Sequence, residues 1–351
     1  MKDGLKLSII VPVYNVENYI RDCFNSIFRQ KLNDDDFEVI IINDGTEDNS
    51  MAVIADIISQ HHNIRIVNQE NQGSSVAWNN GIAIANGEYI LFVDADDLLI
   101  ERRLKLLLQK AVETKADIII PEFIEIVDED ITESKVALLT ASHHPLSFHE
   151  VTGVELFLMN LHPSECFVWR KLYKKDFLIQ NRLSFVPDIH FQDIPFTTEC
   201  YIVAGKCYKT SQLFYIYRKR NVPVTHEFRF KKSCENTIAI AKTWELISRY
   251  QLTGKIKEKL QDNVFSNFSN FSIRVSLLSN DFKEREIIFS RLRENVPDLY
   301  FTNSVRQKFT SFIFWHFPML YNYVNFLYAR IFEDKIRTFY YRLRYKLSHY
   351  F

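Results

Sequence analysis

The sequence predicts an α/β fold, a mainly parallel sheet with flanking helices, followed by a C-terminal region that is all helical. Short runs rich in Ile and Val alternate with helical patterns up to residue 121. From about Lys231 onward only helical periodicity is present, and no glycine occurs after Gly254. The 351 residues are 47% hydrophobic and 25% charged, which is ordinary globular composition and excludes a disordered, collagen-like or disulfide-stapled chain.

The first part of the chain alternates strongly between the two patterns. The expected strands are 7–13, 37–42, 64–67, 89–93 and 117–121, and the expected helices are 17–28, 50–59, 74–85 and 101–113. Strands separated by helices of this length form right-handed βαβ units, so we expect a sheet covered on both faces. Such sheets bind ligands at the carboxyl ends of their strands.

After residue 121 the pattern loosens, and the acidic stretch 128–130 is predicted in a hairpin tip or loop. The later spacing predicts helices at 151–161 and 193–204, a strand at 208–217, and helices at 233–250, 255–278, 283–294 and 303 to the end. A composition shift at 225–232 marks a boundary. We therefore expect a domain 1–228, with halves 1–121 and 122–228, and a helical region 229–351.

Charge and cysteine usage narrow the class of protein. Lys and Arg number 43 and Asp and Glu number 44, so the chain has no overall basic field to hold nucleic acid. The five cysteines are scattered without a CxxC pair, which favours reduced thiols in a cytoplasmic setting. The first residues lack an apolar signal core, so export is not expected.

Three polar clusters follow expected strands, at 12–15, 43–48 and 94–97, and should converge on one edge of the sheet. Asp94, Asp96 and Asp97 crowd three carboxylates into four residues, where repulsion and burial raise pKa values unless a cation compensates. Oxygen ligands suit Mg²⁺ or Mn²⁺, which share substrate phosphates, so the implied ligand is a nucleotide diphosphate. The alternative is an acidic turn that caps a helix starting near Leu98.

The cluster Asp44-Gly45-Thr46 could hold a base or a ribose. The alternative is a turn followed by a helix, with Asp48 or Asn49 as its N-cap. No GxGxxG follows the first strand and no GxxxxGK[ST] occurs in the chain, so neither dinucleotide nor P-loop binding is supported.

Four ordered segments resemble the successive motifs of family 2 glycosyltransferases with the GT-A fold. They are SIIVPVYN at 8–15, IINDGTEDNS at 41–50, NQGSSVAWNNG at 71–81 and GEYILFVDADD at 87–97. The resemblance continues more weakly at 169–173, 191–193 and 215–218, covering about residues 6–225. The helical remainder has no assignable counterpart.

The resemblance implies transfer of a sugar from a nucleotide diphosphate, usually UDP, to an acceptor hydroxyl with inversion. It implies that 1–121 is the nucleotide-binding half and 122–228 the acceptor and base half. Asp44 would read the uracil edge, Asp94 would contact ribose or metal, Asp96 would be the main metal ligand, and Asp97 would line the donor-sugar side. The other implied donor-binding residues are Pro12, Val13, Tyr14, Asn15, Asn79 and Ala95.

Asp193 matches the catalytic base of the family. Inversion in a single displacement needs a base opposite the leaving group and a cation that absorbs charge on the diphosphate. Mg²⁺ or Mn²⁺ is the implied cofactor. Without the resemblance, Asp193 is explained as a carboxylate at a helix N-terminus, favoured by the helix dipole.

The chain departs from the family pattern at several positions. Asn43 replaces a frequent aspartate. Trp78 stands where arginine is common, so a contact near the nucleotide is lost or replaced by stacking. Gln192 replaces a frequent glutamate, which should keep the pKa of Asp193 lower. The alternative function is therefore a catalytically weakened sugar-nucleotide-binding module. A sugar-nucleotide pyrophosphorylase is disfavoured because 13–16 contains neither glycine nor a cation.

The basic cluster Arg218, Lys219 and Arg220, followed by Thr225 and His226, is the basic group nearest in sequence to the expected site. We expect it to form a flexible lid in which Arg218 and Arg220 bind the diphosphate, because Arg pairs bidentately with phosphate oxygens. A solvated basic turn is the alternative.

Residues 300–351 are rich in aromatic side chains, and their cations outnumber their acids. This mixture predicts peripheral contact with an anionic membrane. His316, Pro318 and Asn322 argue against a spanning helix, and a helix packed on the catalytic domain or a partner is the alternative. The expected partners are a UDP-sugar donor and a glycan or lipid-linked glycan acceptor, at the inner face of the plasma membrane.

Overall fold

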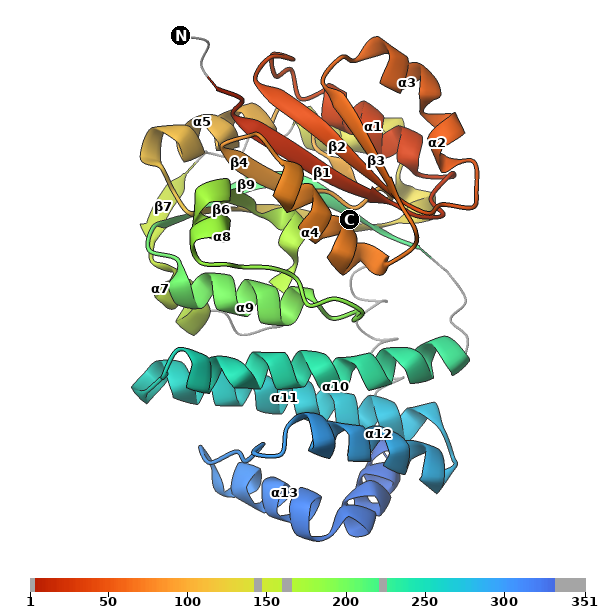
Figure 1. The fold of residues 1–351 in the computed structure, drawn as a ribbon, viewed down its shortest axis with the longest axis vertical. Coiled ribbons are helices and arrows are strands. Elements are labelled where there is room, and N and C mark those ends of the chain that lie inside the picture. Colours follow the sequence, from red (N-terminus) through yellow and green to blue (C-terminus); the bar gives the residue numbers. More distant parts are fainter. Residues whose placement is uncertain (1–3, 142–146, 160–165, 221–225, 332–351) are drawn as a thin grey trace. The chain divides into compact units, whose positions relative to one another are not determined.

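The computed structural model describes residues 4–141, 147–159, 166–220 and 226–331. The chain divides into two compact units, Met1–Pro223 and Val224–Phe351 (Figure 1). The first is an α/β unit and the second is helical, and each is described by itself.

The described strands of the first unit form one mixed sheet in the order β3-β2-β1-β4-β8-β6-β9-β5, with β7 against β9. The strands β1, β2, β3, β4, β6 and β9 share one direction, while β8, β5 and β7 run against their neighbours. The mainly parallel sheet is therefore confirmed. The strands are β1 Leu7–Val13, β2 Phe37–Asp44, β3 Ile64–Gln69, β4 Tyr89–Phe92, β5 Leu98–Leu99, β6 Ile118–Val127, β7 Phe148–Val151, β8 Leu172–Lys174 and β9 Cys207–Lys219.

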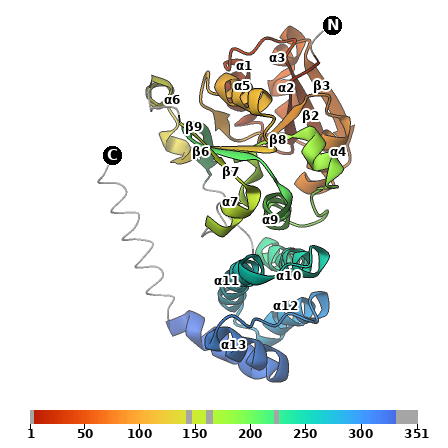
Figure 2. The same ribbon diagram turned by 90° about the vertical axis from the view of Figure 1, so that its left-hand side faces the viewer.

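Helices cover both faces of the sheet, with α1 and α5 on one side and α4 and α9 on the other (Figure 2). Alternate residues of β1 explain this arrangement. Ile9 belongs to the core that includes Phe24 of α1, whereas Ile10 lies so close to Gly81 of α4 that a Cβ there would meet its Cγ2 at 2.3 Å. The helices are α1 Ile20–Phe28, α2 Ser50–Val53, α3 Ala55–Gln60, α4 Gly73–Ile84, α5 Leu104–Thr114, α6 Glu133–Ala141, α7 Gly153–Met159, α8 Lys175–Gln180 and α9 Asp193–Val203.

The differences from the predicted elements are local. The helix expected at 50–59 is interrupted at Ile54, and the acidic stretch Asp128–Asp130 forms a 3₁₀ turn after β6. Leu98–Leu99 forms β5, so the alternative of a helix that starts near Leu98 was wrong. The short elements β5, β7, β8, α6 and α8 were not predicted.

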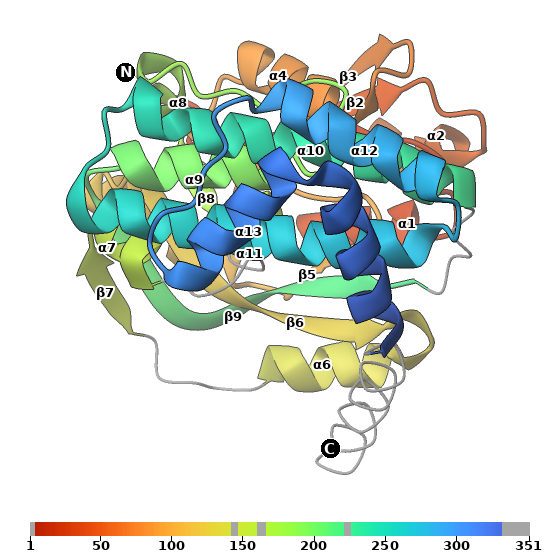
Figure 3. The same ribbon diagram turned by 90° about the horizontal axis from the view of Figure 1, so that it is seen from below.

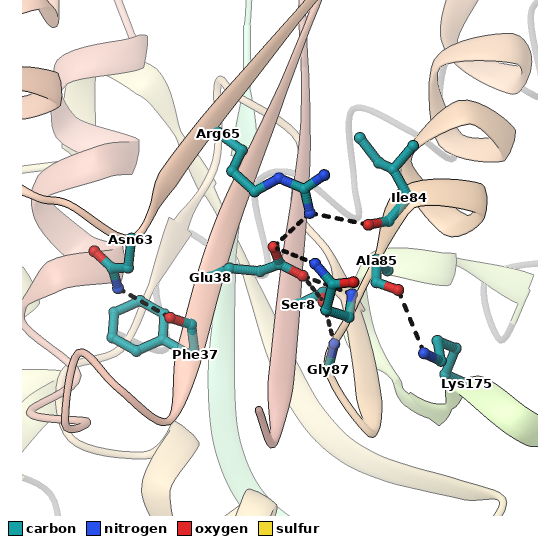
Figure 4. A network of polar contacts seen from close by, with 10 residues as sticks. Ser8, Phe37, Glu38, Asn63, Arg65, Ile84, Ala85, Gly87 and Lys175 are labelled. Atoms are coloured by element: carbon teal, nitrogen blue, oxygen red, sulfur yellow. Dashed lines mark hydrogen bonds and ion pairs between the residues drawn. The ribbon is translucent and has the colours of Figure 1, made fainter. Parts of the chain in front are cut away.

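A buried carboxylate ties the parallel strands together (Figure 4). Glu38 of β2 is 4% exposed and accepts hydrogen bonds from Ser8 Oγ at 2.7 Å and Arg65 Nη1 at 2.8 Å. It also accepts one from the backbone N–H of Asn86 at 2.7 Å, and Ser8 Oγ accepts one from the N–H of Gly87 at 2.8 Å. Burial opposes ionisation, but the bonds from Arg65, Asn86 and Ser8 outweigh it and lower the pKa of Glu38.

The second unit contains α10 His226–Arg249, α11 Gly254–Leu278, α12 Phe282–Asn295, α13 Val305–His316 and a helix at 318–331. The helices α11 and α12 agree with the predicted ones, whereas α10 begins at His226, before the expected start at residue 233. The helix expected from 303 to the end is interrupted at Phe317, before Pro318, and residues 332–351 lie outside the described part of the chain. Phe268, Phe301, Phe314 and Tyr321 form an aromatic core. Within the described residues, every helix is too short or too polar to cross a bilayer.

Replacing Glu38 by Ala should lower the free energy of unfolding by about 3 kcal/mol, because three donors lose a buried acceptor. Since folding lowers the pKa of Glu38 below its ordinary 4.5, this contribution is complete above that pH and is lost as pH falls through the folded value. Urea unfolding of both proteins at several pH values measures it. Asp35→Ala removes a carboxylate whose side chain is 86% exposed and serves as control. Equal losses in the two variants would contradict the structural role.

Candidate active site

The carboxyl ends of the parallel strands meet at one edge of the sheet. Val13 of β1 pairs with Asn43 of β2, and Ile10 pairs with Phe92 of β4. The turns that follow these strands, at 14–17, 45–49 and 93–97, therefore leave the same edge. The three polar clusters of the sequence lie together, as predicted.

Hydrogen bonds connect the first two of these turns to each other. Asn15 has a φ of 52°, and its backbone N–H donates to Thr46 Oγ1 at 2.8 Å while its Oδ1 accepts from the N–H of Glu47 at 3.1 Å. Asp48 Oδ2 accepts from the N–H of Glu17 at 2.9 Å. Burial of Asp48 opposes its ionisation, but hydrogen bonds from Ser50, Glu17 and Thr46 lower its pKa to about 2. The neighbouring Tyr14 is 43% exposed and available to a ligand.

Asp44 lies at this edge, but its carboxylate is engaged inside the chain. The residue is 3% exposed. Its Oδ1 accepts from Gln69 Nε2 at 2.7 Å and from the N–H of Gln72 at 2.8 Å, and its Oδ2 accepts from the N–H of Gly73 at 2.9 Å. Asp44 thus closes the start of α4, and its predicted contact with uracil stays a prediction.

The carboxylate of Asp97 is engaged by residues of β9. It is 1% exposed and faces β9, where its Oδ2 accepts from the hydroxyl of Tyr215 at 2.9 Å and its Oδ1 accepts from the N–H of Arg218 at 2.8 Å. The Tyr215 oxygen also accepts from the N–H of Asp94 at 3.2 Å. Asp97 anchors the acidic turn to β9, and its expected position along the donor sugar stays a prediction.

Asp94 and Asp96 remain as the site-facing acids of this turn. Burial, followed by repulsion from Asp96 and Asp193, raises the pKa of Asp94 well above its ordinary value. Asp96 Oδ2 pairs with Arg220 Nε at 2.8 Å, and its side chain is 17% exposed. In the described part of the chain, no three His, Cys, Asp or Glu side chains are arranged as a metal site. Ala95 between them is 4% exposed.

Arg218 is a buried residue of β9, so the expectation that it belongs to a flexible lid was wrong. It is 6% exposed; its Nη1 contacts Asp128 Oδ1 at 2.6 Å and its Nη2 contacts Asp22 Oδ2 at 3.0 Å. Its Nε donates to the carbonyl of Asp96 at 2.8 Å, which fixes the acidic turn. Arg220 is 34% exposed at its side chain, and the lid residues 221–225 lie outside the described residues.

Asp193 lies in the first turn of α9 and close enough to the acidic turn to repel Asp94. Burial raises its pKa to about 6, although the charge of Lys171 and a hydrogen bond from the backbone of Val168 act in the other direction. The expectation that Gln192, in place of a glutamate, keeps this pKa lower stays a prediction. Lys171 was not singled out from the sequence; it is fully buried, and its Nζ donates to the carbonyl of Phe167 at 2.6 Å.

Gln192 precedes this acid and is 9% exposed. Its Nε2 donates to Ser74 Oγ at 3.0 Å, while its buried Oε1 has no hydrogen-bond partner among the described residues. A buried amide oxygen without a donor is costly, so this atom is suited to a ligand hydroxyl.

Two residues of α4 serve the fold instead of presenting side chains to a donor. Asn79 Nδ2 donates to the carbonyl of Phe185 at 2.9 Å, and Asn79 Oδ1 accepts from the N–H of the same residue at 2.9 Å. Trp78 is 1% exposed and packs edge-on against Phe92 with 4.7 Å between ring centroids. Stacking of Trp78 on a nucleotide is thereby excluded, and Asn79 holds the segment around Phe185.

This sheet, with an acidic turn and a half-buried carboxylate at its carboxyl edge, agrees with the GT-A fold that the sequence resemblance implies. The model of the family "Glycosyl transferase family 2" matches residues 8–175. The chain is 32% identical over 259 residues to the uncharacterized glycosyltransferase EpsJ of Bacillus subtilis, covering 72% of this chain and 73% of EpsJ. It is 32% identical over 232 residues to the uncharacterized glycosyltransferase YibD of Escherichia coli, covering 65% and 66%. The chain therefore belongs to glycosyltransferase family 2.

Solved structures show the same fold at low identity. Staphylococcus aureus TarS 1–349 in complex with UDP-GlcNAc is similar with a TM-score of 0.52 and 20% identity, covering 84% of this chain and 89% of that one. The mannosyltransferase PcManGT of Pyrobaculum calidifontis, in complex with GDP-Man and Mn²⁺, has a TM-score of 0.51 and 14% identity, covering 94% and 87%.

Tyr215→Phe should lower the free energy of unfolding by about 1–2 kcal/mol, because Asp97 loses a buried donor. The acidic turn also loses its anchor, so affinity for UDP in the presence of Mn²⁺ should fall several-fold in calorimetric titration. Tyr217→Phe is the matched control, since the ring of this tyrosine of the same strand stacks on Trp169 and Phe167, while Asp97 accepts its side-chain hydrogen bond from Tyr215. Unchanged UDP affinity in Tyr215→Phe would show that the anchor does not position the turn.

Proposed function

We propose that this glycosyltransferase moves a sugar from a UDP-sugar to an acceptor hydroxyl with inversion, in the assembly of a cell-surface or capsular polysaccharide. The observation that carries the proposal is the half-buried Asp193, with its pKa raised to about 6, beside the acidic turn of Asp94 and Asp96. The UDP-GlcNAc complex of TarS, which has the same fold, supports a UDP-sugar donor.

Asp193 is suited to the role of the base. A carboxyl group with a pKa near 6 is mostly ionised at neutral pH and accepts a proton more readily than an ordinary aspartate. Asp193 lies on α9 and the acidic turn follows β4, so the base and the cation ligands come from separate elements. Asp193 would take the proton of the acceptor hydroxyl as the glycosidic bond to the diphosphate breaks.

The acidic turn fits a hard divalent cation. Because Asp97 faces β9, two carboxylates remain, and Mg²⁺ takes one or two protein carboxylates with phosphate oxygens. Repulsion between Asp94 and Asp96 is also what a cation would relieve. Asp96 and Asp94 would hold Mg²⁺ or Mn²⁺, which when bound neutralises charge on the leaving diphosphate. Arg220, now paired with Asp96, would pair with the diphosphate.

Of the two departures that favoured a weakened sugar-nucleotide-binding module, Trp78 no longer does so. Trp78 is a core residue, so its departure from the family pattern does not alter the nucleotide surface. Gln192 keeps an unsatisfied oxygen, which suits recognition of a sugar or acceptor hydroxyl as well as it suits a loss of turnover. Turnover itself distinguishes the two functions.

The acceptor that we propose is a glycan or a lipid-linked glycan. A lipid-linked acceptor would give a purpose to contact between residues 300–351 and the inner face of the plasma membrane. Labelled UDP-sugars tested with Mg²⁺ or Mn²⁺, with and without lipid-linked acceptors, would identify both substrates.

Asp193→Asn should lower the rate of transfer by about a thousandfold while leaving UDP affinity unchanged, because the amide cannot accept the proton. Transfer of labelled sugar and calorimetric titration with UDP and Mn²⁺ measure the two quantities. Asp176→Asn, at an exposed position of α8, is the matched control. A transfer rate in Asp193→Asn equal to that of the control would remove Asp193 as the base.

The pH dependence of kcat/KM should show an acid limb near pH 6, because Asp193 must be ionised to accept a proton. One unit below that pKa the rate should be about tenfold below its plateau. Lys171→Met should move the limb to higher pH, since the lysine charge lowers the pKa of Asp193. An unshifted limb in this variant would mean that another group controls the profile.

A further inference from the structure

We propose that the outer surface of α13 and of the helix 318–331 is a docking surface for an anionic lipid bilayer. The inference deepens the proposed function, since its purpose rests on a lipid-linked acceptor, but the surface itself is defined by the structure. We call it the apolar face. It consists of Val305, Phe309, Phe312, Met319, Leu320, Tyr323, Val324, Leu327 and Ile331.

The helix α13 buries two polar side chains and exposes several apolar ones. Gln307 is 5% exposed, and its Nε2 donates to Asp262 of α11 at 2.7 Å. Ser311 is 1% exposed, and its Oγ accepts from the N–H of Phe301 at 2.9 Å. Phe314 is buried on the same helix, but Val305 and Phe309 are 85% and 64% exposed. An ordinary surface helix, in contrast, keeps its apolar side chains on the buried face.

The helix 318–331 likewise buries a polar side chain and exposes apolar ones. Asn322 is fully buried; its Oδ1 accepts from Arg285 Nε at 2.8 Å and its Nδ2 donates to Glu286 Oε2 at 3.1 Å. Tyr321 shares a hydrogen bond of 2.7 Å with Ser272. The exposed residues Leu320, Tyr323, Val324, Leu327 and Ile331 recur at three- and four-residue spacing on one side of the helix.

The two apolar stripes belong to one region of the second unit. In Figures 1 and 3, α13 and the helix 318–331 lie on the same side of the α10–α11 pair. Single exposed apolar residues are common on soluble proteins, but two adjacent helices that each bury polar side chains and expose an apolar stripe are not. The buried amides hold both helices in this orientation, so the exposure is built into the fold.

The charge around the apolar face selects an anionic partner. Between residues 299 and 332 the sequence has no Asp or Glu. Arg306 and Lys308, both exposed, flank the Phe309 and Phe312 stripe, and Arg330 lies on the second helix. Cations beside apolar and aromatic side chains match lipid headgroups above acyl chains. The sequence after 331 continues this bias, with Lys335, Arg337, Arg342, Arg344 and Lys346 against Glu333 and Asp334.

A second copy of the chain fits the apolar face less well. In a two-fold symmetric dimer, the same patch would meet itself. Arg306 and Lys308 of both copies would then approach each other, with no acidic residue on either helix to pair with them. A bilayer with anionic headgroups provides the missing negative charge.

The test is co-sedimentation of the full chain with vesicles of phosphatidylcholine alone or mixed with phosphatidylglycerol. We expect binding to the mixed vesicles only. Phe309→Ser combined with Phe312→Ser and Leu327→Ser should weaken it at least about tenfold, since buried apolar area drives insertion. Arg306→Gln combined with Lys308→Gln should weaken it on the order of thirtyfold, roughly fivefold for each cation.

The matched control carries three serines at exposed apolar positions of the α/β unit. Leu138→Ser, Met159→Ser and Ile179→Ser, at positions 73%, 64% and 53% exposed, should leave vesicle binding unchanged. Thermal unfolding verifies that each variant is folded. No vesicle binding by the unaltered chain, equal binding by the triple apolar variant, or a dimer that this variant dissolves would each overturn the proposal. The assay does not depend on sugar transfer, so its failure is distinguishable from failure of the proposed function.

Discussion

The active edge of this protein depends on how one buried turn accommodates three carboxylates. Asp94, Asp96 and Asp97 follow β4 directly, where burial and mutual repulsion disfavour their charged forms. The fold turns these carboxylates in different directions. Asp97 is drawn to the Tyr215 hydroxyl and the Arg218 backbone, the Asp96 carbonyl is held by the Arg218 guanidinium, and Asp94 and Asp96 are left for the site. Because β9 holds the turn from behind, Asp94 and Asp96 form an oriented pair of acids.

That dependence explains why the catalytic chemistry needs both halves of the α/β unit. The acids come from the end of β4, whereas their anchor on β9 and the proposed base, Asp193, come from residues about a hundred positions later. The short strand β8 lies between β4 and β6 and joins the halves in one sheet. An aromatic cluster completes the connection: Phe185 packs against Phe92 at 5.4 Å and against Phe196 of α9 at 3.9 Å between centroids. The position of the base is thus set by apolar packing against the strand that carries the acids.

Sequence patterns predicted the long elements because each has a strong periodicity, and they placed the three polar clusters at one edge because parallel strands end together. They did not predict β5 or β8, since two or three residues carry no periodicity. Motif matching located Asp44, Asn79 and Arg218 but not their partners, which lie 28, 106 and 196 residues away at Gln72, Phe185 and Asp22. A motif gives the position of a side chain in the fold, whereas its hydrogen bonds depend on loops whose course the sequence does not reveal.

The orientation of α13 and of the helix 318–331 could not be predicted from the sequence either. Periodicity shows that a helix has an apolar and a polar face, but it does not say which face is buried, and the usual assumption puts the apolar one inside. In α13 the amide of Gln307 reaches Asp262, and in the helix 318–331 the amide of Asn322 lies between Arg285 and Glu286. Each of these buried polar contacts would be left unsatisfied if its helix rotated by half a turn. The polar contacts, together with the buried rings of Phe314 and Tyr321, therefore determine the orientation of the helices and leave the apolar face exposed.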